Sequence, residues 1–216
     1  MAALSAERVR SNLGAVRDRV DTAAARAGRD ASDVEILVAV KYVAAEDIEV
    51  LADAGVTLVG ENRAQDLAKK VARAPGRFRW HFIGALQSRK VRLIVPHVEL
   101  IHSVATESAL RELGRHAPAE FPILVEVNIG GEAGKAGIAP EALDDFIARS
   151  PVEVVGLMTM PPLTRAPEDS RPHFAALARL GAERGLRVLS MGTSQDYEVA
   201  VEEGATIVRI GTSVVS

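Results

Sequence analysis

The chain has 216 residues, of which 48% are hydrophobic and 25% are charged, a composition typical of a globular protein with a substantial core. Its formal net charge of −3 gives no electrostatic basis for binding nucleic acid or an anionic membrane. The absence of cysteine excludes disulfides, thiolate metal sites and a cysteine nucleophile.

The start of the chain lacks the pattern of an export signal. Such a signal needs a basic segment followed by an apolar run, and Glu7, Arg8 and Arg10 interrupt the first ten residues. No stretch approaches the length of a membrane span. We therefore expect a cytoplasmic protein.

The first predicted element is an amphipathic helix over about 5–27. Ser5 is a plausible N-cap, and valines and a leucine follow at helical spacing with charges between them. Gly28 stands at the expected C′ position. The next segment, 35–40, is a nearly continuous apolar run of the kind that forms a parallel strand buried on both faces.

Alternating strand-like and helix-like segments continue to the end of the chain. Strands are predicted at 35–40, 57–60, 80–83, 99–104, 122–128, 153–158, 187–191 and 206–210, and helices at 46–54, 63–73, 140–149, 171–184 and 195–203. Eight such repeats predict a (β/α)8 barrel forming a single domain over 1–216. A doubly wound open sheet is the main alternative, but the first strand lacks the Gly-x-Gly-x-x-Gly turn of its dinucleotide-binding form. The proline-rich stretch 161–167 is interpreted as a loop after the sixth strand.

Polar side chains gather where the predicted strands end. In barrels of this class the active site lies at the carboxyl ends of the strands, and phosphate often binds in the loops after strands seven and eight. The residues in question are Lys41, Glu61, Asn62, His102, Ser103, Asn128, Gly192, Thr193, Ser194, Arg209, Gly211 and Thr212.

Lys41 follows an apolar strand directly. A desolvated amine there would be a usable nucleophile, as a Schiff-base lysine requires. The alternative is a strand-end lysine whose ammonium group extends to solvent.

Two glycine turns, 192–194 and 211–212, follow the last two strands. Free N–H groups and hydroxyls at such turns can converge on an anion, or Thr193 and Ser194 can simply cap a helix. Arg209, inside the last strand, would need an acceptor if it points inward; a pyridine nitrogen is one such acceptor, and an acidic surface neighbour is the alternative.

The histidines have no metal-ligand spacing, so no metal is expected. His81 and His102 could reach the barrel mouth, although a histidine on an apolar strand is more often a hydrogen-bonded core residue. No Gly-x-Ser-x-Gly or Walker motif occurs.

Several segments, in order, resemble the YggS/PROSC-type pyridoxal phosphate (PLP) homeostasis proteins. The matching blocks are Leu37-Val-Ala-Val-Lys41, Val59-Gly-Glu-Asn62, Trp80-His-Phe-Ile-Gly84, Leu86-Gln-Ser88, Ile101-His-Ser103, Val127-Asn-Ile129, Lys135-Ala-Gly-Ile138, Gly156-Leu-Met158, Leu189-Ser-Met-Gly192 with Ser194, and Val208-Arg-Ile-Gly-Thr212. The resemblance covers about 35–212, most of the chain.

The resemblance implies a barrel like the N-terminal domain of alanine racemase, with PLP bound as a Schiff base. By the same resemblance the cofactor-binding residues are Lys41 for the Schiff base, Arg209 for the pyridine nitrogen, Ser194, Gly211 and Thr212 for the phosphate with Thr193 assisting, and Asn62 and His81 in the ring pocket. The sequence departs from the family pattern at Val40, Tyr42, Thr193 and Arg89.

The same residues favour a PLP carrier over an enzyme. Arginine cannot give up its proton, so Arg209 would leave the ring a weak electron sink. Tyr42 is expected to point away from Lys41 by strand alternation, and Tyr197 lies in a predicted helix, so neither is a convincing base. A PLP-dependent racemase or lyase, and less favourably a Schiff-base aldolase on a phosphorylated substrate, stay open. The family suggests a monomer that hands PLP to apo-enzymes.

Overall fold

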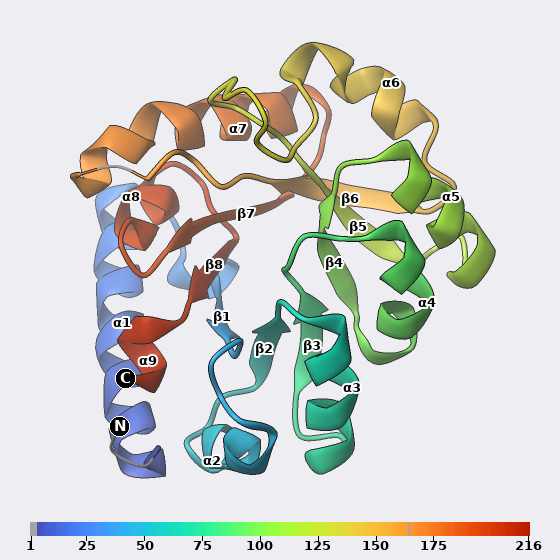
Figure 1. Ribbon diagram of the computed structural model, residues 1–216. Helices are drawn as coiled ribbons and strands as arrows, with labels where there is room; N and C mark the ends of the chain where they lie inside the picture. Colours follow the sequence, from blue (N-terminus) through green and yellow to red (C-terminus); the bar gives the residue numbers. More distant parts are fainter. Residues whose placement is uncertain (1–3, 164) are drawn as a thin grey trace.

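Eight parallel strands close into a barrel in which each strand pairs with the next in sequence, and β1 pairs with β8 (Figure 1). The computed structural model describes residues 4–163 and 165–216. The predicted (β/α)8 architecture is confirmed. Glu35 aligns with Ile207 and Val38 with Ile210 across the closing pair, so the seam between the first and last strands is formed over four residue pairs.

The strands are short and the helices between them vary in length. The strands are β1 (Glu35–Ala39), β2 (Leu58–Glu61), β3 (Arg79–Phe82), β4 (Leu100–Val104), β5 (Pro122–Glu126), β6 (Glu153–Met158), β7 (Val188–Thr193) and β8 (Ile207–Ile210). The α-helices are α1 (Ala6–Arg26), α2 (Ile48–Asp53), α3 (Ala64–Arg73), α4 (Val91–Ile94), α5 (Glu107–His116), α6 (Leu143–Ala148), α7 (Arg171–Glu183), α8 (Tyr197–Glu202) and α9 (Thr212–Val215). Short 3₁₀ turns include η3 (Ser88–Lys90), η4 (Val95–His97) and η6 (Pro167–Ser170).

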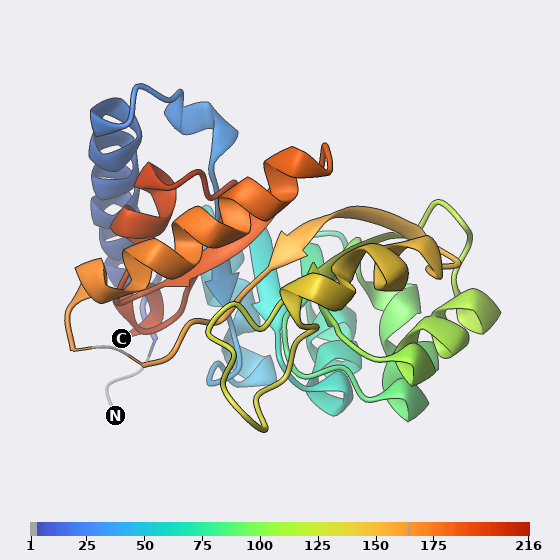
Figure 2. The same cartoon turned by 90° about the horizontal axis from the view of Figure 1, so that it is seen from above.

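Two apolar layers hold the fold together. Side chains on the inner face of the barrel form a small cluster of Leu37, Leu58, Leu100, Leu124, Met158 and Ile207. The opposite faces of the same strands, including Val38, Val59 and Val125, pack with the helices in a larger cluster. Because successive strand residues face opposite sides, the nearly continuous apolar runs in the sequence supply both layers at once. Figure 1 shows the helices arranged around the strands, and Figure 2 shows the same molecule turned by 90°.

The N-terminal helix is confirmed in position and length. The Ser5 hydroxyl accepts a hydrogen bond from the Arg8 N–H at 3.5 Å, and Gly28 has a φ of 66° just beyond the helix end. Its buried face, which includes Val9, Val16 and Val20, packs against α8 and α9. The Asn12 side chain also donates to the carbonyls of Val214 and Ser216 at 3.2 and 3.3 Å. The first helix thus secures the last turn of the chain.

Some predicted boundaries were wrong. The predicted fifth strand, 122–128, ends at Glu126, because Val127 leaves the sheet to form an isolated bridge with Ile138. A helical segment over 88–97, formed by η3, α4 and η4, was not predicted, since Pro96 and the absence of a long apolar stripe hide its period. The described part of 161–166 is a loop as predicted, and Pro167 already begins η6; Thr164 lies outside the described residues. No helix in the described part of the chain is long and apolar enough to cross a membrane.

Candidate functional site

The predicted site residues all lie at the carboxyl end of the barrel. They sit in or just after the strand ends: Lys41 after β1, Asn62 after β2, His81 in β3, Thr193 at the end of β7 and Ser194 after it, Arg209 in β8, and Gly211 and Thr212 at the start of α9. Because all eight strands are parallel, these ends share one mouth. The structure thus places these residues at the predicted end of the barrel, and their joint role in holding a cofactor stays a prediction.

The environment of Lys41 differs from the sequence expectation. Strand β1 ends at Ala39, so Lys41 and Tyr42 occupy a turn and both are exposed, Tyr42 at 72%. Of the two readings of Lys41, the structure has the amine that extends to solvent and not the desolvated one. The expectation that Tyr42 points away was wrong, because strand alternation does not apply in a turn. The Lys41 Nζ atom lies 4.7 Å from the centre of the Tyr42 ring, within cation–π range. The amine is therefore accessible from the barrel mouth.

Arg209 points into the barrel and is 6% exposed. Its Nη1 group donates to Ser190 Oγ at 2.5 Å, and its Nη2 group donates to the Thr159 carbonyl at 2.9 Å. Burial lowers the pKa of the guanidinium to about 10, while the charges of Asp196 and Glu126 oppose that shift. The alternative of a surface arginine paired with an acidic neighbour is thus excluded, and a charged donor group sits below the mouth.

A chain of buried side chains continues from Arg209 across the barrel. His102 Nδ1 lies 2.8 Å from Ser190 Oγ, and His102 Nε2 lies 2.9 Å from His81 Nδ1. Arginine can only donate, so Ser190 accepts from Arg209 and its own proton is free to bind His102. Burial lowers the pKa of His81 to about 3 and that of His102 well below its ordinary value. Both rings are neutral, hydrogen-bonded groups inside the barrel, and the described residues contain no cluster able to hold a metal ion.

These histidines make stability depend on pH. Their pKa values are lower in the folded protein than in the unfolded chain, so below about pH 6.5 the unfolded state takes up protons that the folded state does not. We expect each histidine to cost about 1–2 kcal/mol of unfolding free energy at pH 5 relative to pH 7.5. Burial raises the pKa of Glu126, which contributes with the opposite sign.

Urea unfolding at the two pH values measures this loss. Replacing His102 with asparagine is expected to reduce the loss, whereas His116→Asn, at an exposed position on α5, should leave it unchanged. An unfolding free energy that does not change between pH 7.5 and 5 would contradict the assignment of neutral buried rings.

The two glycine turns meet in space. Ser194 Oγ accepts the Gly211 N–H at 3.2 Å and the Ser213 N–H at 3.5 Å, which brings the turn after β7 onto the first turn of α9. Gly192, whose φ is 89°, allows the close approach to α8, because a Cβ atom there would lie 2.6 Å from the Ala200 Cβ. A hydroxyl and two amides therefore converge at one point of the mouth. Because both amides donate to the Ser194 oxygen, the hydroxyl proton of Ser194 is the donor that this point offers to an anion.

Thr193 is engaged differently. Its amide and its hydroxyl both donate to Asp196 Oδ1, at 2.8 and 3.1 Å, and Asp196 Oδ2 accepts from Ser170 at 2.9 Å. The carboxylate thereby fixes the turn that carries Ser194. The predicted contact of Thr193 with a phosphate stays a prediction.

Asn62 carries an unsatisfied group. Within residues 4–163 and 165–216, its Oδ1 atom is buried and has no hydrogen-bond partner. The turn is tight: a Cβ atom at Gly84 would lie 2.0 Å from the Asn62 carbonyl, so only glycine allows the loop after β3 to pass there. A buried acceptor without a donor costs free energy, which a ligand donor would recover.

Three polar residues of the barrel were missed by sequence analysis. Glu126 and Ser190 lie on the inner face, two residues after the inward Leu124 and Val188, so strand alternation from those positions could have found them. Lys70 is 3% exposed and follows the buried Leu67 at helical spacing. A lysine on the apolar stripe of α3 was the available signal.

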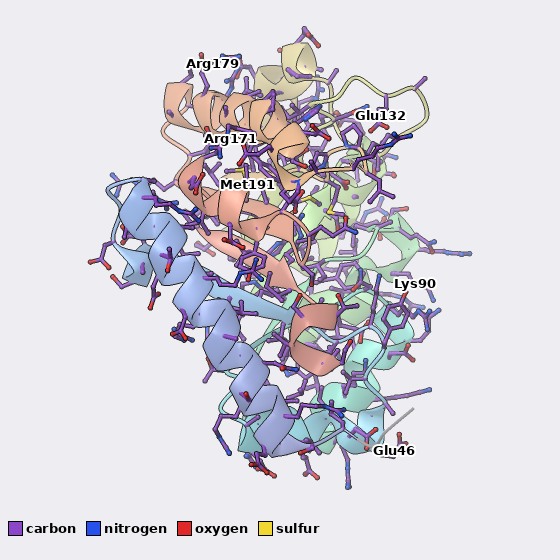
Figure 3. The ribbon with its side chains drawn as sticks, turned by 90° about the vertical axis from the view of Figure 1, so that its left-hand side faces the viewer. Glu46, Lys90, Glu132, Arg171, Arg179 and Met191 are labelled. Carbon is purple, nitrogen blue, oxygen red and sulfur yellow. The ribbon has the colours of Figure 1, made fainter. Side chains whose placement is uncertain are left out.

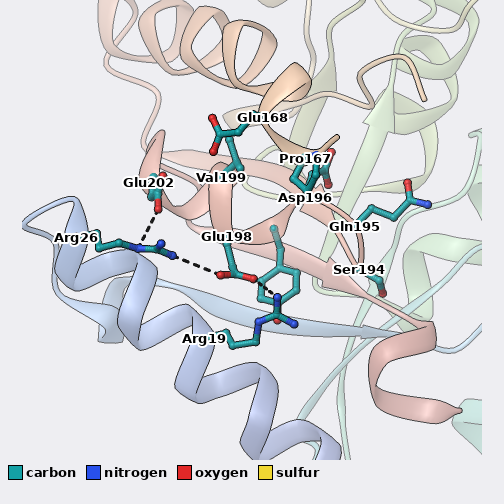
Figure 4. A pocket seen from close by; sticks show the side chains of 11 residues that line it. Arg19, Arg26, Pro167, Glu168, Ser194, Gln195, Asp196, Glu198, Val199 and Glu202 are labelled. Carbon is teal, nitrogen blue, oxygen red and sulfur yellow. Dashed lines mark hydrogen bonds and ion pairs between the residues drawn. The ribbon is translucent and has the colours of Figure 1, made fainter. Parts of the chain in front are cut away.

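A separate cavity of about 230 Å³ lies outside the barrel, between α1 and α8 (Figure 4). Its charged groups are already paired: Arg19 with Glu198 at 2.5 Å, and Arg26 with Glu202 at 3.1 Å. Arg171, the first residue of α7 and labelled in Figure 3, pairs with Glu202 at the end of α8 and with Glu203 just after it, each at 2.6 Å. Of the predicted site residues only Ser194 touches this cavity, so it is not the mouth that holds Lys41.

Comparison with known proteins supports one family. A model of the N-terminal domain of alanine racemase matches residues 11–216. The "Pyridoxal phosphate homeostasis protein" of Aquifex aeolicus is 42% identical over 214 residues, covering 93% of this chain and 94% of the relative. The protein of the same name from Escherichia coli K12 is 34% identical over 223 residues and covers 94% of each chain.

Solved structures agree with this fold. PipY of Synechococcus elongatus with PLP bound has a TM-score of 0.79 and 28% identity, covering 96% of this chain and 100% of PipY. A Bifidobacterium adolescentis protein described as unknown has a TM-score of 0.87 and 31% identity, covering 97% and 95% of the two chains. An arginine decarboxylase of Paramecium bursaria Chlorella virus, 13% identical with a TM-score of 0.70, shares the fold alone.

Proposed function

Because the chain belongs to the alanine racemase N-terminal domain family, with the pyridoxal phosphate homeostasis proteins as relatives over most of its length, we propose that it binds PLP on Lys41 and serves in PLP homeostasis. One observation carries the proposal: an accessible amine, a buried guanidinium, an unsatisfied amide oxygen and a convergent anion site share one barrel mouth. The proposal treats residues 1–216 as a single domain.

The mouth fits the chemical groups of PLP. The cofactor supplies an aldehyde, which condenses with a primary amine, and Lys41 offers an exposed one. Arg209 offers N–H groups toward the ring nitrogen. The Asn62 oxygen can accept from a ring hydroxyl. Ser194 and Thr212 supply hydroxyl donors for the phosphate, and the Gly211 amide, which donates to the Ser194 oxygen, holds Ser194 in place for it. His81 and Thr193 complete the proposed set as supporting groups.

The direct test of the proposal is spectroscopic and chemical. Purified protein with added PLP should show the absorption band of a Schiff base, and borohydride reduction should leave a pyridoxyl adduct on the peptide containing Lys41. A colourless protein with no adduct at Lys41 would contradict the proposal. The aldolase alternative predicts that result, and the names of the relatives lend it no support.

The proposed contact between Ser194 and the PLP phosphate can be tested separately. Replacing Ser194 with alanine removes the hydroxyl that joins the two turns, and we expect PLP to bind about ten- to a hundredfold more weakly, the effect of one charge-assisted hydrogen bond. Pyridoxal, which lacks the phosphate, should bind with nearly unchanged affinity. Equilibrium titration of both ligands measures the difference.

Ser213→Ala is the matched control for that titration. It removes an exposed hydroxyl but keeps the backbone N–H that contacts Ser194. Equal weakening of PLP and pyridoxal by Ser194→Ala would place the phosphate elsewhere.

We propose a carrier and not a turnover enzyme. The support is chemical: Tyr197 is buried on α8 beside the outer cavity, so it is not placed as a proton-transfer group in the barrel. Tyr42 lies beside Lys41, but it is 72% exposed in the turn and not enclosed with a substrate inside the barrel. A weak racemase or lyase activity is the second candidate, and Glu126 favours it. This carboxyl is 9% exposed inside the barrel, and burial raises its pKa while the charges of Arg209 and Lys135 oppose that shift, so it is the acidic group best placed to exchange a proton there. Spectral shifts with added amino acids, followed by turnover assays, separate the two.

The proposal also covers the cellular location, the oligomeric state and the partner proteins. We propose a cytoplasmic monomer that passes PLP to apo-enzymes, a role supported by the resemblance to homeostasis proteins. Light scattering of the holo-protein measures the oligomeric state, and PLP transfer to an apo-enzyme measures delivery.

A further inference from the structure

A buried ion pair lies beneath the turn that carries Lys41. Glu61, at the end of β2, is 0% exposed, and Lys70, on α3, is 3% exposed. The Lys70 ammonium donates to Glu61 Oε2 and also to the Val40 carbonyl, the latter at 2.7 Å. The pair therefore joins the ends of β1 and β2 to one helix.

The carboxylate of Glu61 is fully engaged. While Oε2 accepts from Lys70, Oε1 accepts the backbone N–H of Asn62 at 2.6 Å and that of Arg63 at 2.9 Å. Desolvation makes a buried ion pair a poor source of stability, since apolar replacements of both partners are often neutral or stabilising. What such a pair fixes well is the position of the groups bound to it.

The groups that the ion pair holds are the Val40 carbonyl, which precedes Lys41, and the backbone amide of Asn62. Lys41 and Asn62 are both proposed cofactor residues. Val40 is bonded on both sides: its N–H donates to the Gly60 carbonyl at 2.9 Å, and its carbonyl accepts from Lys70 at 2.7 Å and from the Val43 N–H at 3.0 Å. Lys41 is the next residue, and its exposed side chain depends on this backbone for its direction. On the other side, Glu61 fixes the amide of Asn62, whose Oδ1 atom is the unsatisfied acceptor.

We propose that Glu61 and Lys70 are positioning residues. They hold the backbones of Lys41 and Asn62 in the positions that Schiff-base formation with PLP requires. The inference rests on the proposed function. Neither side chain would touch the cofactor, because both are buried behind the turn. Their effect would reach the reaction through the Val40 carbonyl and the Asn62 amide, so it should bear on Schiff-base formation more than on phosphate binding.

The test replaces both partners, since removing one leaves an unpaired buried charge. The variant E61Q/K70M keeps similar volumes without charges. Its matched control is E112Q/R115M, which removes an ion pair on α5 where Arg115 is 68% exposed. The readouts are the affinities for PLP and for pyridoxine 5′-phosphate, which lacks the aldehyde, and hydrogen exchange of the peptide over 40–45 in the ligand-free protein.

For E61Q/K70M we expect PLP affinity to fall at least tenfold, pyridoxine 5′-phosphate affinity to fall less than threefold, and exchange over 40–45 to rise about tenfold. The control should match the wild type in all three. If circular dichroism shows that E61Q/K70M is unfolded, the variant E61Q/K70Q replaces it, because its two amides can bond each other. We expect the same large loss of PLP affinity and small loss of pyridoxine 5′-phosphate affinity.

Equal losses of both ligands, no loss of PLP affinity, or unchanged exchange over 40–45 would each overturn the positioning role. A wild-type protein that forms no adduct at Lys41 would instead defeat the proposed function. The exchange rates of the two double variants would then still decide whether the pair holds the turn.

Discussion

Replacing Lys41 with alanine is expected to abolish covalent attachment of PLP. The wild-type protein, reduced with borohydride in the presence of PLP, should carry one pyridoxyl group on the peptide containing Lys41, and the variant none. The reason is chemical, since no other group in the proposed site is a primary amine on the turn after β1. Intact-mass spectrometry and the absorption band of the Schiff base measure the loss.

Two comparisons sharpen this experiment. Lys41→Arg keeps the positive charge beside the Tyr42 ring but offers no amine for a Schiff base, so it should also lose the adduct. Lys69→Ala, at an exposed position of α3, should retain it. An adduct that persists in Lys41→Ala at the wild-type level would show that another lysine is the attachment point.

Arg209→Met is expected to give the largest loss of stability. The methionine would leave Ser190 without its buried donor and the Thr159 carbonyl unsatisfied, at a cost of about 3 kcal/mol in unfolding free energy. For a chain of this length that corresponds to a Tm lower by roughly 6–12 °C. PLP should also bind more weakly, because the proposed donor to its ring nitrogen is gone.

Calorimetry with and without PLP measures both effects. Arg179→Met, on the outer face of α7 with its side chain 72% exposed, is the control and should change the unfolding free energy by less than about 0.5 kcal/mol (Figure 3). A stable Arg209→Met protein with full PLP affinity would contradict the role given to the buried guanidinium.

The fold could be predicted because its signal is local and repeated. Apolar runs such as 35–40 recur with helix-favouring segments between them, and parallel connectivity then determines that the strand ends share one mouth. The location of the site followed from the same rule, as the placement of Ser194, Gly211 and Arg209 illustrates.

The remaining features depend on where a strand ends and on contacts between distant segments. β1 stops at Ala39, one residue before the predicted end, and the turn that follows decides between the two open readings of Lys41 in favour of an exposed amine. The partnership of Glu61 with Lys70, and that of Ser190 with His102 and Arg209, joins different elements of the barrel. No local pattern encodes such pairs, because side-chain register and helix rotation are set only when the barrel closes.

The seam between β1 and β8 also bears on the order of events during synthesis. The first strand has no partner on that side until β8 has been made, so the nascent chain carries an open sheet edge while all the intervening elements are synthesised. Ser194 and the amides of Gly211 and Ser213 also belong to this late part of the barrel. An intermediate that lacks β8 would thus present Lys41 without the turns proposed to bind the phosphate, so we expect firm PLP binding only after the barrel has closed.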